Sequence, residues 1–195
     1  MRSSATPNLR EVKKQRTRDA IVAAATSLFD EHGYDAVTVA AVAEAAEVGQ
    51  RTLYRHFADK EDFLFAADDE LHDAMRREAA GVPVDVSAPA VVARAACAVA
   101  EGLEPDRDML IRRARVIERT PALQAREGLK HAALRRLFVE ELVHRGHPRD
   151  HARLVAGIGI ACVEEALARW LEAPDGVTLA RVLGGVEIEI RRFTL

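Results

Sequence analysis

Apolar residues recur every three or four positions through most of this chain, whereas the strict alternation typical of strands is rare. Ile21, Ala25 and Phe29 lie on one face of a helix predicted over 16–32, and Gly33 follows as its stop signal. Aromatic residues make up only 5% of a composition that Ala, Leu, Arg and Glu dominate. The pattern therefore predicts an all-α protein.

Residues 38–60 predict two short helices joined by a tight turn. Thr38 is a candidate N-cap of the first helix, and Gly49 interrupts the apolar pattern before the second. Leu53 and Phe57 are four positions apart on the buried side of the second helix. Its other face is rich in hydrogen-bond donors and carries no acid, as expected of a helix that enters a DNA groove.

The remaining sequence predicts a long fourth helix and then a helical body. Asp59 is the candidate cap of the long helix, and Asp62 is placed to complete a reciprocal capping pair. Gly and Pro residues indicate a loop over 81–89. Further helices are expected near residues 90–102, 106–119, 122–145, 149–172 and 178–193.

Charge is distributed unevenly, although the net charge is only −3. Residues 1–18 carry Arg2, Arg10, Lys13, Lys14, Arg16 and Arg18 against the single acid Glu11, a net of +5 that leaves −8 for the remainder. A basic arm therefore precedes an acidic body, and this distribution is compatible with nucleic-acid binding.

Cysteine use and hydropathy indicate a cellular compartment. Cys97 and Cys162 are far apart, with no paired motif and no secretory signal, so we expect a reducing cytoplasm. No apolar run approaches the roughly 20 residues that span a bilayer. We therefore expect a soluble, cytoplasmic protein.

The second short helix lies within a longer motif. It is made of Val48, then Thr52-Leu53-Tyr54-Arg55-His56-Phe57, then Lys60-Glu61. This motif resembles the DNA-binding motif of the TetR family of bacterial transcriptional regulators. The resemblance implies a three-helix helix-turn-helix head followed by a helical ligand-binding and dimerisation body.

Two residues near the turn depart from the family pattern. Glu47 is present where the family usually has Gly, and Gly49 where it usually has Ser. A left-handed backbone at Glu47 would cost about 1 kcal/mol, whereas a Gly cap loses only a few tenths relative to Ser, roughly.

The motif nominates a set of DNA-contacting residues. Arg51 and Arg55 can donate to guanine edges, although an arginine on a helix is often merely solvated. By resemblance Tyr54 and His56 bind phosphate oxygens, with packing at the helix edge as the alternative. Lys60 opposes the helix dipole, and phosphate contact would explain it better than exposure to water alone. The full predicted set is Thr38, Gln50, Arg51, Thr52, Tyr54, Arg55, His56 and Lys60.

The last two predicted helices carry apolar faces that are either ordinary core or a dimer interface. Self-association is favoured because a body this small has limited surface to cover them. By resemblance the helix pair meets its two-fold mate as a four-helix bundle. The predicted interface residues are Leu154, Ile158, Cys162, Val182, Val186 and Ile190; Trp170 is assigned to the interface or to the pocket without a choice between them.

The body also offers a predicted ligand pocket. Small side chains outnumber large aromatic ones between residues 90 and 145, so voids are expected there. Residues 106–172 resemble a TetR subgroup whose body binds acyl-CoA-like ligands, and an arginine would suit an anionic head group. The predicted lining residues, of which most could be plain core, are Ala96, Cys97, Met109, Arg113, Val116, Ile117, Leu134 and Phe138.

No constellation of residues indicates catalysis, a cofactor or a metal. His144, His147 and His151 are separated by Gly146 and Pro148 and lack further ligands. An all-helical enzyme of apolar substrates and a protein-binding helical scaffold remain the alternatives.

The favoured function is a ligand-responsive homodimeric repressor of a near-palindromic operator. Residues 1–58 form the expected DNA-binding domain, and residues 59–195 form the ligand-binding and dimerisation domain. A small apolar effector, with acyl-CoA-like molecules as one candidate class, would release the DNA.

Overall fold

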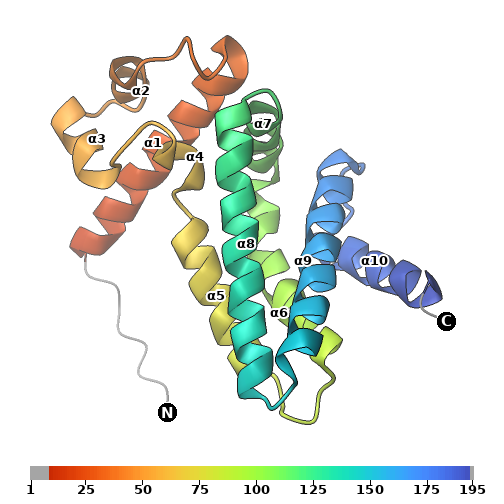
Figure 1. Cartoon of the computed structure of the whole chain (residues 1–195). Coiled ribbons are helices and arrows are strands. Elements are labelled where there is room, and N and C mark those ends of the chain that lie inside the picture. Colours follow the sequence, from red (N-terminus) through yellow and green to blue (C-terminus); the bar gives the residue numbers. More distant parts are fainter. Residues whose placement is uncertain (1–8, 194–195) are drawn as a thin grey trace. The chain divides into compact units, whose positions relative to one another are not determined.

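The computed structural model describes residues 9–193, and every regular element in that range is a helix (Figure 1). This confirms the predicted all-α class. In chain order the elements are α1 (Leu9–His32), α2 (Val39–Ala45), α3 (Gln50–His56), α4 (Asp62–Phe65), α5 (Asp68–Gly81), α6 (Ala88–Leu103), the 3₁₀ helix η1 (Glu104–Asp106), α7 (Arg107–Glu118), α8 (Pro121–His144), α9 (Arg149–Glu172) and α10 (Leu179–Phe193).

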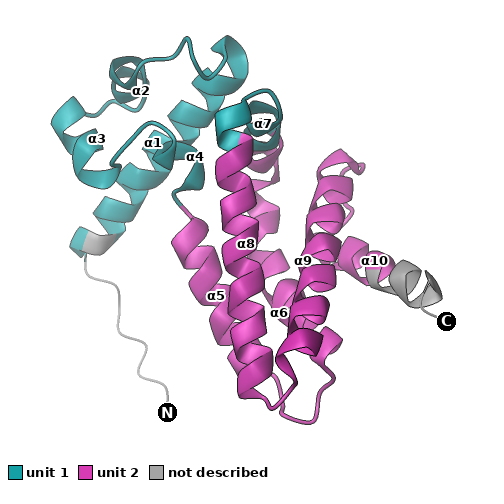
Figure 2. Cartoon of the chain, in the orientation of Figure 1, with its two compact units in different colours: residues 1–66, 112–123 teal, residues 67–111, 124–195 magenta. Residues whose placement is uncertain are grey.

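The chain divides into two compact units (Figure 2). The head unit comprises the described residues through Ala66 together with Arg112–Leu123, and the body unit comprises the remainder. Helices α7 and α8 therefore contribute residues to both units. The functional boundary between residues 58 and 59 stays a prediction, since a compact unit is defined by packing and not by what it binds.

In the head unit, α1 packs against α2 and α4, and α2 packs against α3. Ile21, Ala25 and Phe29 are fully or almost fully buried as predicted. The helix predicted from residue 16 begins at Leu9, because residues 9–15 contain no Gly or Pro and consist mostly of good helix formers. The described part of the basic arm is therefore helical.

The long helix predicted from Asp59 is interrupted. Its start behaves as expected, since the backbone N–H of Asp62 donates to Oδ1 of Asp59 at 2.9 Å, and Oδ2 of Asp62 accepts from the N–H of Ala58 at 2.9 Å. The helix nevertheless ends at Phe65, and α5 begins at Asp68.

The break has a packing cause. Phe63, Leu64 and Phe65 are all at most 5% exposed, and successive residues of a helix lie on different faces, so three in a row require neighbours on most sides. The carbonyl oxygen of Leu64 accepts from Nε of Arg113 at 2.7 Å, and that of Ala66 accepts from the guanidinium of Arg18. Arginine side chains thus satisfy backbone acceptors at the break.

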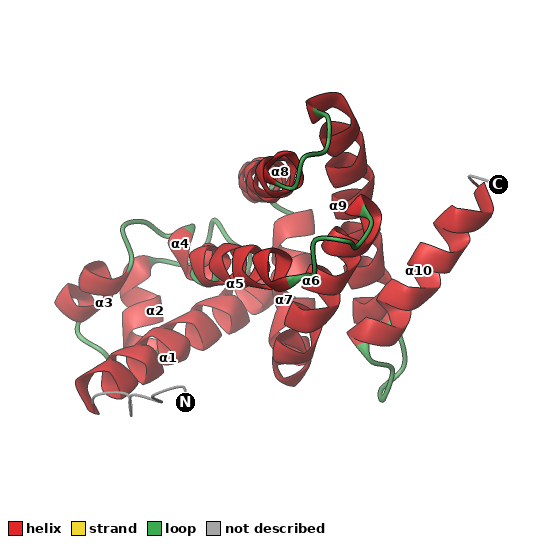
Figure 3. Ribbon diagram, turned by 90° about the horizontal axis from the view of Figure 1, so that it is seen from below, coloured by secondary structure: helices red, strands yellow, loops and turns green. Residues whose placement is uncertain are grey.

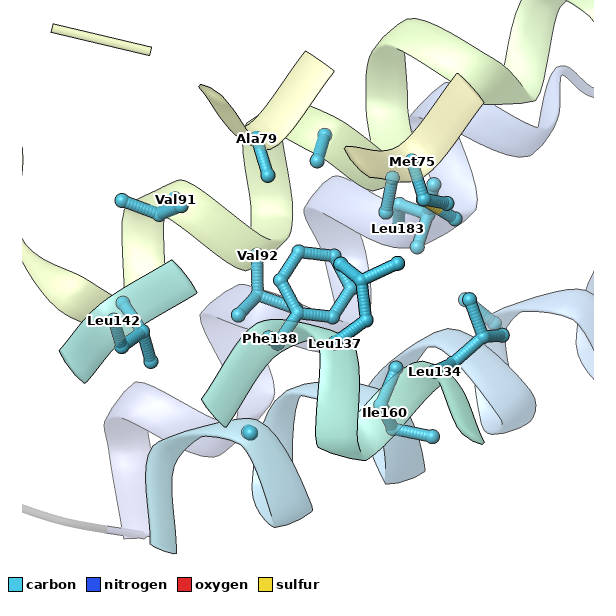
Figure 4. Packing of buried hydrophobic residues seen from close by; sticks show 14 of the residues in the cluster. Met75, Ala79, Val91, Val92, Leu134, Leu137, Phe138, Leu142, Ile160 and Leu183 are labelled. Atoms are coloured by element: carbon cyan, nitrogen blue, oxygen red, sulfur yellow. The ribbon is translucent and has the colours of Figure 1, made fainter. Parts of the chain in front are cut away.

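In the body unit, α6 packs against α5 and α9, and α10 packs against α6 and α9 (Figure 3). A Cβ atom at Gly159 would lie 2.7 Å from Cγ1 of Val92, so glycine permits the close approach of α9 to α6. Helix α8 instead packs against its neighbours through side chains. Within residues 9–193 its backbone does not come as close to another helix. Phe138 and Leu142 of α8 are fully buried in the core that Figure 4 shows.

None of the helices in residues 9–193 combines the length and apolarity needed to cross a membrane.

Candidate nucleic-acid interface and interior cavity

The turn between α2 and α3 is built from backbone hydrogen bonds. Oγ1 of Thr38 accepts from the N–H of Ala41 at 3.1 Å, so Thr38 caps the start of α2 as predicted. At the other end, the N–H of Val48 donates to the carbonyl of Ala43 at 2.9 Å, and that of Glu47 donates to the carbonyl of Glu44 at 3.0 Å. These two bonds form a Schellman motif.

Glu47 occupies the left-handed position of that motif. Its φ is +54°, the conformation that glycine adopts without a steric penalty from Cβ. The strained turn considered from the sequence is therefore present. It ends α2 sharply and allows α3 to begin at Gln50, with Gly49 as an N-cap that offers no side-chain hydrogen bond.

Helix α3 buries one face and exposes the other. Leu53 and Phe57 are at most 3% exposed and lie in the head core. Gln50, Arg51 and Arg55 are exposed, as is Tyr54 at 57%, and Thr52 is half-buried. The structure therefore presents these predicted residues on the accessible side of α3, apart from the partial burial of Thr52. Their contacts with DNA stay a prediction.

His56 lies at the end of α3 among several cations. Burial, and then the positive charges of Arg55, Lys14 and Arg18, lower the pKa of His56, so the imidazole is neutral near pH 7. Its buried Nδ1 atom has no hydrogen-bond partner within the described residues. Lys14 and Arg18 belong to α1, so the end of α3 and this part of α1 share a positive field that would attract phosphate.

Lys60 is engaged within the head. Its ammonium group donates to the carbonyl oxygen of Tyr34 and lies 4.2 Å from the centre of the Tyr34 ring and 5.4 Å from that of Phe29. Burial lowers the pKa of Lys60, and the negative charge of Asp35 partly offsets this. These contacts give a structural reason for a cation here, and phosphate contact stays a prediction.

The body unit contains a cavity of about 60 Å³. It is lined by Leu71, Met75, Ala96, Val99, Leu103, Lys130, His131, Leu134, Ile160, Val163, Glu164, Leu167, Leu179 and Leu183. Ala96 and Leu134, two of the predicted ligand-binding residues, line this cavity, and ligand binding there stays a prediction. Phe138 is fully buried in the core, and Cys97 and Met109 are half-buried without lining the cavity.

The other predicted pocket residues belong to the head unit. Val116 and Ile117 lie in the head core, and the guanidinium of Arg113 lies 5.0 Å from the centre of the Phe65 ring. They are not among the residues that line the cavity of the body unit. Periodicity shows that a helical face is buried without showing which unit covers it.

Sequence reasoning missed the three polar lining residues. Nδ1 of His131 lies 2.9 Å from Oε1 of Glu164, and Nζ of Lys130 lies 3.1 Å from Oε1 of Glu127 and 3.6 Å from Oδ1 of Asp68. The sequence signal that could have indicated two of them is the pair Lys130 and His131, which comes one turn before the buried Leu134 on the same helix. The nearby Glu165 pairs with Arg169 at 2.6 Å, four positions along α9.

The predicted dimer interface is partly accessible. Leu154 and Ile158 are 63% and 45% exposed, which is unusual for large apolar side chains one turn apart on α9. Cys162 and Val182 are half-buried. Val186, by contrast, is 4% exposed in a single chain and belongs to its own core, and the side chain of Ile190 lies outside the described residues.

Trp170 lines neither an accessible face nor the cavity. It is 1% exposed, and its Nε1 donates to the carbonyl of Val177 at 2.9 Å. Within the described residues there is also no group of three or more His, Cys, Asp or Glu side chains arranged to hold a metal ion.

Two family models match the chain. The model described as bacterial regulatory proteins, tetR family, matches residues 21–67, and that of the MftR C-terminal domain matches residues 86–187. The first covers the turn and α3, and the second covers α9 and the cavity-lining residues from Ala96 onward.

Similar proteins agree with these models. The HTH-type transcriptional regulator TcmR of Streptomyces glaucescens is 37% identical over 127 residues, which are 61% of this chain and 55% of TcmR. The chain thus spans about half the length of this curated relative.

Solved structures share the fold. NalD, the secondary repressor of the MexAB-OprM multidrug efflux pump in Pseudomonas aeruginosa, has a TM-score of 0.62 at 17% identity, covering 92% of this chain and 96% of NalD. FadR of Bacillus subtilis, solved with stearoyl-CoA, also has a TM-score of 0.62, at 18% identity, covering 86% and 94%. The chain therefore belongs to the TetR family of bacterial transcriptional regulators, which are not enzymes.

Proposed function

We propose that this protein is a cytoplasmic, dimeric repressor that reads a near-palindromic operator with α3 and leaves it when a small apolar effector occupies the body. The observation that carries the proposal is the exposed face of α3, which has no acid. The helix ends at His56, which lies in the positive field of Arg55, Lys14 and Arg18. Arg51 and Arg55 would donate to base edges, and Lys14 with the described arm would supply affinity through phosphate contacts.

Release follows from geometry. A two-fold dimer places its two reading helices about 34 Å apart, one turn of DNA, when it binds adjacent major grooves. An effector that favours another arrangement of the body would change this spacing and lower the affinity. The continuity of α7 and α8 through both units supports such coupling, because regular helices transmit displacement along their length.

The DNA contacts are tested by affinity and salt dependence on a near-palindrome from the intergenic DNA that flanks the gene. Arg51→Ala should cost about 1–3 kcal/mol on this site and relax its specificity. Lys14→Ala should weaken all sequences alike and reduce the salt slope by about one. Lys14 is a cleaner probe than Lys60, which also holds Tyr34.

Arg94→Ala, at an exposed position of α6, is the matched control and should leave the affinity unchanged. If Arg51→Ala weakens operator and random DNA equally, α3 does not read bases. A protein with no salt-dependent DNA affinity at all would instead fit the scaffold alternative.

We further propose that Leu154 and Ile158 of α9 lie in the dimer interface. Covering them in a contact of more than about 1,000 Å² would remove an exposed apolar patch. Ile158→Asp should convert the dimer to a folded monomer in light scattering, whereas Leu129→Asp at the 72% exposed Leu129 of α8 should not. A dimer that survives Ile158→Asp would place the interface elsewhere.

The effector class is the least determined part of the proposal. The fold shared with FadR, whose structure contains stearoyl-CoA, supports trying acyl-CoA molecules. Arg113, however, is engaged with Leu64 and Phe65 in the head unit and is not among the residues that line the cavity. The residues that do line the cavity are the better guide.

A further inference from the structure

The cavity joins an apolar interior to a charged rim. Its lining is predominantly aliphatic, as Met75, Leu134, Ile160 and Leu183 in Figure 4 illustrate. Lys130, His131 and Glu164 are the ionisable residues among those that line it. A ligand with an apolar body and one polar group would match this division.

The charges of the rim disfavour an anionic group. Lys130 is already engaged by two carboxylates, Glu127 at 3.1 Å and Asp68 at 3.6 Å, and its side chain is only 11% exposed. Glu127 also lies 3.6 Å from Nε2 of His131. Lys130 and His131 are thus each paired with carboxylates already, so an incoming anion would have to displace an acid from Lys130.

Glu164 is the more accessible end of the cluster. Its side chain is 42% exposed, against 17% for Glu127, and it pairs with His131. An imidazole carries a full positive charge only when protonated, so it is a weaker partner for a carboxylate than a permanent cation is. A cationic group that reached Glu164 could take the place of His131.

We infer that the effector is an apolar amine, whose body enters the cavity and whose protonated nitrogen pairs with Glu164 in place of His131. This inference rests on the proposed function, of which it specifies the ligand. The present cavity of about 60 Å³ is smaller than the roughly 150 Å³ that accommodates benzene in an engineered protein core. The amine must therefore enlarge it.

Enlargement of the cavity and pairing of the amine with Glu164 would both act on α8. The contact between His131 and Glu164 joins α8 to α9, and α8 packs in the body mainly through side chains. Replacing that contact would loosen α8, whose first residues, up to Leu123, belong to the head unit. The binding event is thereby linked to the unit that carries α3.

The test compares octylamine, octanol and octanoate, which share one chain and differ in head-group charge. Calorimetry at pH 7.5 with the full-length protein should show octylamine binding at least tenfold more tightly than octanoate, with octanol between them. Glu164→Gln should weaken octylamine roughly tenfold and leave octanol unchanged. Octylamine should also lower operator affinity in the wild type.

Glu165→Gln is the matched control, since it makes the same change on the next residue of α9, which does not line the cavity. Three results would overturn the inference: octanoate binding as tightly as octylamine, no binding of any probe, or equal losses in Glu164→Gln and Glu165→Gln. Operator binding without any probe is measured in parallel. Its loss would count against the proposed function, whereas intact DNA binding with a failed probe series would count against the amine alone.

Discussion

The two hydrophobic cores of this protein are filled in different ways. In the head, the ring centres of Phe57 and Phe63 are 5.1 Å apart with nearly perpendicular planes, and those of Phe29 and Phe63 are 6.4 Å apart. The body core is instead dominated by Ala, Val and Leu, with Phe138 and Trp170 as the buried aromatic residues in its described part. Interlocking rings leave little free space, whereas small side chains on separated helices leave a void.

This difference matches the proposed division of labour. A reading helix must be held in one orientation, and the head packs rings and the cation of Arg18 against the end of α3, where the guanidinium lies 5.4 Å from the centre of the Phe57 ring. A sensor must adapt to its ligand, and α8 packs in the body through side chains without close backbone approach to another described helix. Residue size thus distinguishes the packing of the two cores.

The largest expected effect comes from removing a ring of the head core. Phe63 is fully buried, so Phe63→Ala should cost about 3–5 kcal/mol of unfolding free energy. Leu134→Ala, beside an existing cavity, should cost about 2 kcal/mol, the low end for such a change, because fewer neighbours are lost.

The two units can be followed separately. Trp170 is the only tryptophan and lies in the body, so its fluorescence reports the body while far-UV circular dichroism reports all helices. Phe63→Ala should advance the dichroism transition relative to the fluorescence transition. Equal shifts of both would mean that the units unfold as one and that the contrast between them has no energetic meaning.

A second prediction compares two glycines of α9, one in tight contact with α6 and one without such a contact. Gly159→Ala would bring a Cβ to 2.7 Å from Cγ1 of the buried Val92, so overpacking should cost about 1–3 kcal/mol. Gly157→Ala, two residues earlier on α9, meets only Cδ of Arg135 at 3.9 Å and should stabilise the helix by up to about 1 kcal/mol. Urea denaturation measures both, and a stabilising Gly159→Ala would show that α6 and α9 are not in tight contact.

The sequence predicted the positions of the helices better than the packing contacts between them. Helical periodicity, the stop signal at Gly33 and the interruption at Gly49 located most elements, because these signals depend on nearby residues. The break between Phe65 and Asp68 was missed, since it arises from three consecutive buried residues whose neighbours come from distant segments.

The candidate sites show the same limit. The exposed face of α3 could be predicted, because a short amphipathic helix has only one face to bury. The rim of the cavity could not, because Lys130 and Glu164 are 34 positions apart in the chain and only packing brings them to one cavity. Arg113 was assigned to the body for the converse reason, since no local signal shows that α7 passes into the head.

The smallest predicted effect tests how firmly the head fixes α3. Glu47 adopts φ +54° in the Schellman motif, so Glu47→Gly should relieve steric strain and stabilise the head by about 1 kcal/mol. Glu47→Ala removes the same charge but keeps a Cβ, so it should give little of this gain. Thermal unfolding followed by circular dichroism distinguishes the two. Equal stabilisation by Gly and Ala would assign the effect to the lost carboxylate, and the turn before α3 would then be unstrained.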